Sequence, residues 1–208
     1  MNVLIVNMSP RARGTSAMLA GMCAERLEGH GHTVLRAELY RERNDPQALY
    51  AKVAGADVLV LSGPCYINTY PADVTAFLEG MAARPDILHG QALYGMIQGG
   101  MPYVHTHEGG LSMLRVFARR TGLRYLGGFV MGMGAMVDGG PIDKLLNAKK
   151  ARRQLTVFFD HVCRGEPSPR EVYLAAQMKI PALLARLLAA YANRAAAREA
   201  RRVGAAQR

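Results

Sequence analysis

The sequence has few cysteines and no long apolar run. Its 208 residues include only Cys23, Cys65 and Cys163, which lie far apart and show no Cys-x-x-Cys spacing. This pattern argues against a metal cluster and against a disulfide framework. No apolar run reaches the ~18 residues that a membrane span needs. The first residues already follow a strand pattern instead of a charged and apolar leader, so we expect a cytoplasmic protein.

Two common nucleotide-binding motifs are missing as well. The chain has no Gly-x-x-x-x-Gly-Lys-Ser/Thr loop and no Gly-x-Gly-x-x-Gly turn, which argues against a triphosphate P-loop and a dinucleotide fingerprint. The length suffices for one domain with a substantial core and an appendage. About half of the net charge of +10 comes from residues 166–208. The basic character therefore belongs to the C-terminal segment more than to the body.

What the sequence does contain is a regular alternation of strand and helix patterns. Strands are predicted at residues 3–8, 33–38, 57–63, 92–98 and 124–131, and helices at 17–27, 46–54, 71–81, 111–121 and 141–164. Such alternation predicts an α/β fold with a five-stranded parallel sheet covered by helices on both faces. Ligands of these sheets bind beyond the carboxyl ends of the strands. The loops after the first, third and fourth strands are therefore the candidate site.

The loop after the first strand has the composition of an anion site. A buried strand runs into Ser9-Pro-Arg-Ala-Arg-Gly-Thr-Ser16 and then into a helix, so unpaired backbone N–H groups and the helix dipole meet at one point. Hydroxyl donors come from Ser9, Thr15 and Ser16, and positive charge from Arg11 or Arg13. The sequence predicts a site for one terminal phosphate. The alternative is an ordinary N-capped turn without a ligand.

The loop after the third strand has the composition of an aromatic wall. It reads Gly63-Pro-Cys-Tyr-Ile-Asn-Thr-Tyr-Pro71, and a flat heteroaromatic ring would stack against it. The alternative is a proline-stiffened turn whose tyrosines cover the core. We interpret Cys65 as a packing residue of this loop, because no basic neighbour in the sequence would activate its thiol.

The loop after the fourth strand begins with the glycine pair Gly99-Gly100, which suits close approach of a ligand to the backbone. Beyond it, Tyr103 or one of His105 and His107 is a candidate to face a substrate or cofactor. The two histidines together with Glu108 could also imitate metal ligands or face water. We predict no metal site.

Taken in order, these motifs resemble the NADPH-dependent FMN reductase family. Ser9-Pro-Arg-x-x-Gly-Thr-Ser16 is similar to the family's phosphate loop, Pro64-x-Tyr66-x-x-x-x-Pro71 to its isoalloxazine loop, and Gly99-Gly100 to its glycine pair. The resemblance spans residues 1–165. It implies a flavodoxin-like doubly wound sheet in the order 2-1-3-4-5, noncovalent FMN and a homodimer or homotetramer. The cysteine cluster of the related iron–sulfur flavoproteins is missing.

The resemblance also implies an activity and a set of cofactor-binding residues. The activity is an FMN-dependent NAD(P)H oxidoreductase that passes hydride through FMN to a quinone, a flavin or another small acceptor. The phosphate would be held by Ser9, Arg11, Thr15 and Ser16, and the ring by Pro64, Cys65, Tyr66, Ile67, Asn68, Gly99, Gly100 and Tyr103. Hydride transfer requires no side-chain acid or base, so no catalytic residue is named. The alternative is a flavodoxin-type electron carrier, but such carriers usually present an acidic surface and this chain is basic.

Residues 166–208 form a predicted second part, a basic amphipathic helix behind the linker 166–169. An apolar stripe at helical spacing comprises Ile180, Leu183, Leu184, Leu187, Leu188 and Tyr191, and the segment also carries Arg186, Arg194, Arg198, Arg201 and Arg202. Packing on the chain's own domain or on another subunit would bury the stripe. Contact with an anionic membrane surface is the alternative, and no nucleic-acid partner is expected.

Overall fold

The computed structural model describes residues 1–178 and 181–206. Its contacts divide the chain into two units, Met1–Gln177 and Met178–Arg208. The first unit contains one sheet whose neighbouring strands are all parallel, in the order β2-β1-β3-β4-β5. The strands are β1 (Asn2–Asn7), β2 (Thr33–Glu38), β3 (Val58–Pro64), β4 (Ala92–Gln98) and β5 (Arg124–Met131). The parallel α/β fold and the strand order expected from the resemblance are confirmed.

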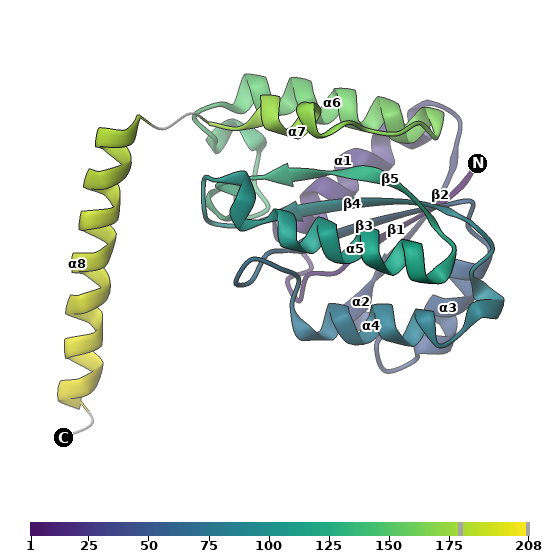
Figure 1. The fold of residues 1–208 in the computed structure, drawn as a ribbon, viewed down its shortest axis with the longest axis horizontal. Coiled ribbons are helices and arrows are strands. Elements are labelled where there is room, and N and C mark those ends of the chain that lie inside the picture. Colours follow the sequence, from purple (N-terminus) through teal and green to yellow (C-terminus); the bar gives the residue numbers. More distant parts are fainter. Residues whose placement is uncertain (179–180, 207–208) are drawn as a thin grey trace. The chain divides into compact units, whose positions relative to one another are not determined.

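Helices cover both faces of this sheet (Figure 1). One face carries α1 (Thr15–Gly29) and α6 (Ala148–Arg164), and the other carries α2 (Leu39–Glu42), α3 (Pro46–Ala54), α4 (Ala72–Ala82) and α5 (Glu108–Thr121). Every residue of β3 and β4 is buried as a result. Coverage on both faces is the reason that these strands read as nearly continuous apolar runs instead of alternating patterns.

One short helix, α7 (Arg170–Ala176), packs against α6 and β5 and was not predicted from the sequence. The Ser168 N–H donates to the Leu126 carbonyl at 2.7 Å and so ties the chain before α7 to the outer edge of the sheet. By contacts, the first unit therefore extends to Gln177. The boundary at residues 165/166 given by the sequence pattern stays a prediction.

Two helices begin three or more residues away from their predicted starts. Helix α5 begins at Glu108 instead of residue 111 and includes Gly109 and Gly110. A Cβ on Gly110 would lie 2.3 Å from Ile97 Cδ1 and 3.1 Å from the Tyr70 ring, so a larger residue would force these side chains to shift where this helix approaches β4. The helix predicted over 141–164 is interrupted: a 3-10 turn at Ile142–Lys144 precedes α6.

The second unit consists of α8 (Ala182–Ala206). Leu183, Leu184, Leu187 and Tyr191 are exposed along it, and a single helix cannot bury its own apolar face. Of the predicted stripe, Ile180 lies outside the described residues, as does the side chain of Leu188; the side chain of Arg202 is likewise outside them. Among the described helices, none has the length and apolar character to cross a bilayer.

Candidate functional site

The loop between β1 and α1 presents an open helix N-terminus. Gly14 is the N-cap of α1; the helix has no side-chain capping bond and no acidic residue in its first turn. The first N–H groups of an α-helix lack intrahelical partners and lie at the positive end of its dipole. The loop before it is held by its own hydrogen bonds: the Arg11 N–H donates to Ser9 Oγ at 3.1 Å, and the Gly14 N–H donates to the Arg11 carbonyl at 3.2 Å. This end of the helix fits an anion.

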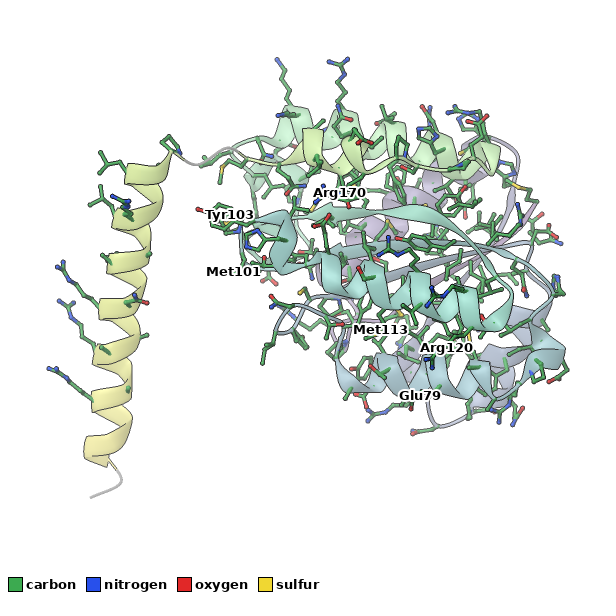
Figure 2. The ribbon with its side chains drawn as sticks, viewed as in Figure 1. Glu79, Met101, Tyr103, Met113, Arg120 and Arg170 are labelled. Carbon is green, nitrogen blue, oxygen red and sulfur yellow. The ribbon has the colours of Figure 1, made fainter. Side chains whose placement is uncertain are left out.

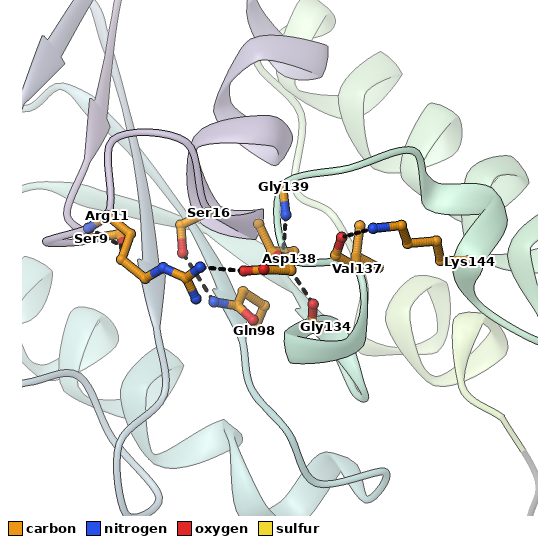
Figure 3. Close-up of polar contacts among 10 residues, drawn as sticks. Ser9, Arg11, Ser16, Gln98, Gly134, Val137, Asp138, Gly139 and Lys144 are labelled. Carbon is orange, nitrogen blue, oxygen red and sulfur yellow. Dashed lines mark hydrogen bonds and ion pairs between the residues drawn. The ribbon is translucent and has the colours of Figure 1, made fainter.

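The hydroxyls that begin α1 contact the loop after β5 and the end of β4, and Figure 3 shows Ser16 beside Gln98. Thr15 Oγ1 donates to the Gly134 carbonyl at 2.8 Å and accepts from the Gly139 N–H at 3.3 Å. Ser16 is fully buried, and its Oγ accepts from Gln98 Nε2 at 3.3 Å. Thr15 already donates its hydroxyl proton to Gly134, so it offers an anion chiefly its backbone N–H group. Ser16 Oγ accepts in its contact and keeps its O–H for an anion beside its backbone N–H.

The loop after β3 forms a narrow turn at the rim of the sheet. The Tyr66 N–H donates to the Thr69 carbonyl at 2.7 Å, and Ile67 and Asn68 form the tip with φ values of +51° and +68°. Ile67 is 96% exposed and Tyr66 is 50% exposed. Side chains exposed to this extent at the end of a parallel sheet are available to a ligand.

Cys65, in the same loop, faces inward. Its Sγ donates to the Thr106 carbonyl at 3.2 Å, and burial raises the pKa of the thiol. A protonated thiol is a poor nucleophile. These contacts support the interpretation of Cys65 as a packing residue.

The loop after β4 is built over a buried histidine. His107 is 1% exposed, its Nδ1 lies 3.0 Å from the Tyr103 carbonyl, and burial lowers its pKa. A Cβ on Gly99 would lie 2.5 Å from His107 Nε2, so only glycine fits above this ring. Tyr103 is 41% exposed and stacks on His105 with ring centroids 5.7 Å apart. Figure 2 shows Tyr103 and Met101 projecting from this loop at the end of the sheet.

The Glu108 carboxylate pairs with residues of α7 and not with His105 or His107. Its carboxylate accepts from Arg170 Nε at 2.6 Å and from the Tyr173 hydroxyl at 2.7 Å, and the Arg170 guanidinium holds the pKa of Glu108 below its usual value. Glu108 therefore connects α5 to α7.

Four loops enclose one cavity of about 130 Å³ at the carboxyl ends of the strands. The predicted residues that line it are Ser9, Arg11, Thr15, Pro64, Cys65, Tyr66, Gly99 and Gly100. The other predicted residues are not part of its lining. Ser16 is buried, Ile67 and Asn68 form the tip of the β3 loop, and Tyr103 belongs to the β4 loop.

The cavity also has lining residues that the sequence did not identify, namely Gly14, Gln98, Ala135 and Asp138. Gln98 Oε1 is buried and has no hydrogen-bond partner among the described residues. Leaving a buried carbonyl oxygen unpaired is costly, so this atom is suited to a donor supplied by a ligand. A signal for Gln98 existed: it is the polar residue that ends an apolar strand. No comparable signal marks Asp138.

Larger cavities lie elsewhere. One of about 540 Å³ lies between α4 and α5 and is lined by residues such as Glu79, Met113 and Arg120 (Figure 2). Another, of about 350 Å³, lies at the outer edge of β5 beside Arg170. Neither is lined by a residue of the β1 loop. Because parallel sheets bind ligands at the carboxyl ends of their strands, we assign the site to the smaller cavity.

Comparison with known proteins identifies the family and the fold. The model of the family "NADPH-dependent FMN reductase" matches residues 1–140. This range contains the loops after β1, β3 and β4 and the first part of the loop after β5. No curated protein matches the sequence.

Several solved structures share the fold. The apo form of the NADH:FMN oxidoreductase EMOB is 19% identical with a TM-score of 0.64, over 83% of this chain and 93% of that one. An FMN-dependent NADH-azoreductase from Bacillus anthracis, solved with FMN, is 13% identical with a TM-score of 0.58, over 78% and 100%. An NAD(P)H:quinone oxidoreductase from Methanothermobacter marburgensis is 18% identical with a TM-score of 0.55, over 76% and 96%. At these identities the likeness concerns the fold.

Proposed function

Because the chain belongs to the NADPH-dependent FMN reductase family, we propose that it transfers hydride from NAD(P)H by way of FMN to a small acceptor such as a quinone or a free flavin. Membership makes it an NAD(P)H-dependent oxidoreductase with FMN as cofactor and NAD(P)H as co-substrate. FMN supplies the hydride chemistry when bound, and the protein supplies binding, orientation and electrostatics.

The convergence of three loops on one cavity is the observation that carries this proposal. The open N-terminus of α1, the ring of Tyr66 and the bare backbone of Gly99 all border the same space. A phosphate fits the first, a flat ring fits the second, and the third allows close approach. The unpaired Gln98 Oε1 adds a buried acceptor for a donor group of the ligand. The residues present therefore fit FMN.

Each part of the cofactor has a proposed set of partners. The N–H groups at the start of α1, together with Ser9 and Arg11, would hold the phosphate. The ring would lie against Pro64, Tyr66, Gly99 and Gly100, with Ile67, Asn68 and Tyr103 at its border. A cavity of about 130 Å³ is small beside ordinary ligand sites of several hundred Å³. We therefore expect it to receive the phosphate-bearing end, while the ring lies on the rim.

Neither His107 nor Cys65 is suited to exchange a proton near neutral pH. His107 is buried with a lowered pKa, and Cys65 has a raised one, so near neutral pH one is a neutral imidazole and the other a thiol. Hydride transfer needs neither. We propose that these side chains position the loops, and that protons for a quinone acceptor come from solvent.

An absorbance spectrum of the purified protein tests the proposal. We expect a yellow protein, or a colourless one whose melting temperature rises with added FMN, because a ligand that binds only the folded state stabilises it by about 2.7 kcal/mol at a hundred times its Kd. Anaerobic NADPH should then bleach the flavin absorbance. A colourless protein that gains no thermal stability from excess FMN would refute the proposal.

The same titration separates an enzyme from an electron carrier. A flavodoxin-type carrier would bind FMN but show no NAD(P)H turnover. The net charge of +10 favours the enzyme, since carriers of that type usually present an acidic face.

We further propose that the chain forms a homodimer or homotetramer. The exposed Leu183, Leu184 and Leu187 of α8 support this, because an apolar helix face is stabilised by packing on a second copy. Light scattering on the full chain and on residues 1–177 tests the proposal: the full chain should be oligomeric. If α8 instead contacts membranes, the full chain should sediment with anionic vesicles and the truncated chain should not.

A further inference from the structure

An ion pair spans the cavity that we assign to FMN. Arg11 Nη2, from the loop after β1, donates to Asp138 Oδ1, from the loop after β5. Both residues line the cavity, and Figure 3 shows the pair bridging the two loops. Both side chains are more than half exposed, at 66% and 53%, so the pair can open without disturbing the core.

The carboxylate is held in this place by the backbone around it. Asp138 and Gly139 have φ values of +50° and +73°. A Cβ on Gly139 would lie 1.8 Å from the Arg13 carbonyl oxygen, so only a glycine at position 139 lets the β5 loop run this close to the β1 loop. The Gly139 N–H also donates to Thr15 Oγ1 at 3.3 Å. The β5 loop is therefore anchored to the start of α1, with Asp138 facing Arg11.

This arrangement places a negative charge beside an anion site. The helix N-terminus and Arg11 attract a phosphate, whereas Asp138 repels it and already occupies the guanidinium. A ligand phosphate that pairs with the remaining N–H groups of Arg11 meets a guanidinium whose charge Asp138 already partly neutralises. The carboxylate thus acts as an internal competitor for the phosphate of the ligand.

We propose that Asp138 lowers the affinity of the site for phosphorylated flavin and so keeps FMN exchangeable. When FMN binds, Arg11 divides its N–H donors between Asp138 and the phosphate, and the carboxylate weakens the phosphate contact. The inference rests on the proposed function, because it takes the ligand to be FMN with its phosphate at α1. Asp138 therefore affects which flavin binds, because it disfavours a flavin with a phosphate relative to one without.

The variant Asp138→Asn tests the proposal. Asparagine tolerates a left-handed backbone, so the loop should keep its shape while the charge is removed. The matched control is Asp143→Asn, which removes the same charge from a pair with Arg152 (2.8 Å) that does not line the cavity. FMN and riboflavin, which lacks the phosphate, are titrated into each apoprotein, and quenching of flavin fluorescence reports the Kd.

We expect Asp138→Asn to bind FMN about 3- to 10-fold more tightly, the range set by one exposed ion pair and one like charge, with a slower release of FMN. Riboflavin affinity should be unchanged, and Asp143→Asn should behave as wild type. Equal or weaker FMN binding by Asp138→Asn would overturn the inference, since it would make the carboxylate a bystander or a support for Arg11. A parallel gain for riboflavin would overturn it as well. If the wild-type protein binds no FMN, the proposed function itself fails, which is a distinguishable result.

Discussion

Replacing Gly14 with aspartate should separate the stability of the protein from its affinity for FMN. Gly14 is the N-cap of α1 and has no side chain to accept from the first N–H groups of the helix. Aspartate is among the best N-cap residues. In the Gly14→Asp variant the new carboxylate would accept from the same N–H groups that we assign to the phosphate. The helix would gain a cap, and the ligand would lose its site.

The two effects have opposite signs and different sizes. Asp in place of Gly at an N-cap stabilises by a few tenths of a kcal/mol, and a negative charge at the helix N-terminus adds about 0.3–1 kcal/mol. Each hydrogen bond to a charged group that the phosphate loses costs about 1.5–3 kcal/mol, which is roughly a 10- to 150-fold increase in Kd. A Cβ at this position meets Arg11 Cβ at 3.3 Å and the Arg11 carbonyl oxygen at 3.5 Å, so a shift of the β1 loop by a few tenths of an ångström offsets part of the gain.

Urea unfolding and FMN titration on the same preparations measure both quantities. Gly14→Asn is the matched control, because it caps the helix with the same shape and no charge. We expect Gly14→Asp to be at least as stable as wild type and to bind FMN at least tenfold more weakly, with a smaller loss for Gly14→Asn. Undiminished FMN affinity in a stable Gly14→Asp protein would show that the phosphate does not bind at the start of α1.

Three further outcomes follow from the site. Tyr66→Ala should weaken FMN binding about 3- to 10-fold through lost ring contact without changing the urea midpoint, whereas Leu146→Ala, at an 88% exposed position outside the cavity lining, should change neither. Gly99→Ala should cost about 1–3 kcal/mol of stability because its Cβ would lie 2.5 Å from His107 Nε2; adding His107→Ala should recover part of that loss in urea melts, and strictly additive effects would contradict the contact. Burial holds the pKa of His107 below 6.5, so the unfolded chain takes up the proton first and wild-type stability should fall as the pH drops below 6.5. Melts at pH 7.5 and 5.5 should show a smaller fall for His107→Gln, and equal falls would refute a buried neutral ring.

Local patterns in the sequence were sufficient for the strands and for their parallel arrangement, and the family resemblance supplied their order in the sheet. Strand runs such as 57–63 and 92–98 are apolar throughout because both faces of a parallel sheet are covered, and their alternation with helices leaves few topologies. The binding loops were identifiable for the same reason. Each follows directly from a strand, and parallel strands end at a common edge, so Ser9, Tyr66 and Gly99 had to lie near one another.

Contacts between distant segments decided the rest. Helix α7 was missed because its seven residues (Arg170–Ala176) are held by packing on α6 and β5, which no local periodicity reports. The need for glycine at residue 99 comes from His107, whose ring fills the space below it.

The sequence by itself determined the order of strands and helices and the three loops that meet at the end of the sheet, because both depend on local spacing and on parallel topology. Only the tertiary structure brought Asp138 to Arg11, across 127 residues of chain. That contact depends on how the loop after β5 folds back onto the start of α1. Its path is set by Gly139 passing the Arg13 carbonyl, a steric condition between segments that neither segment reveals alone.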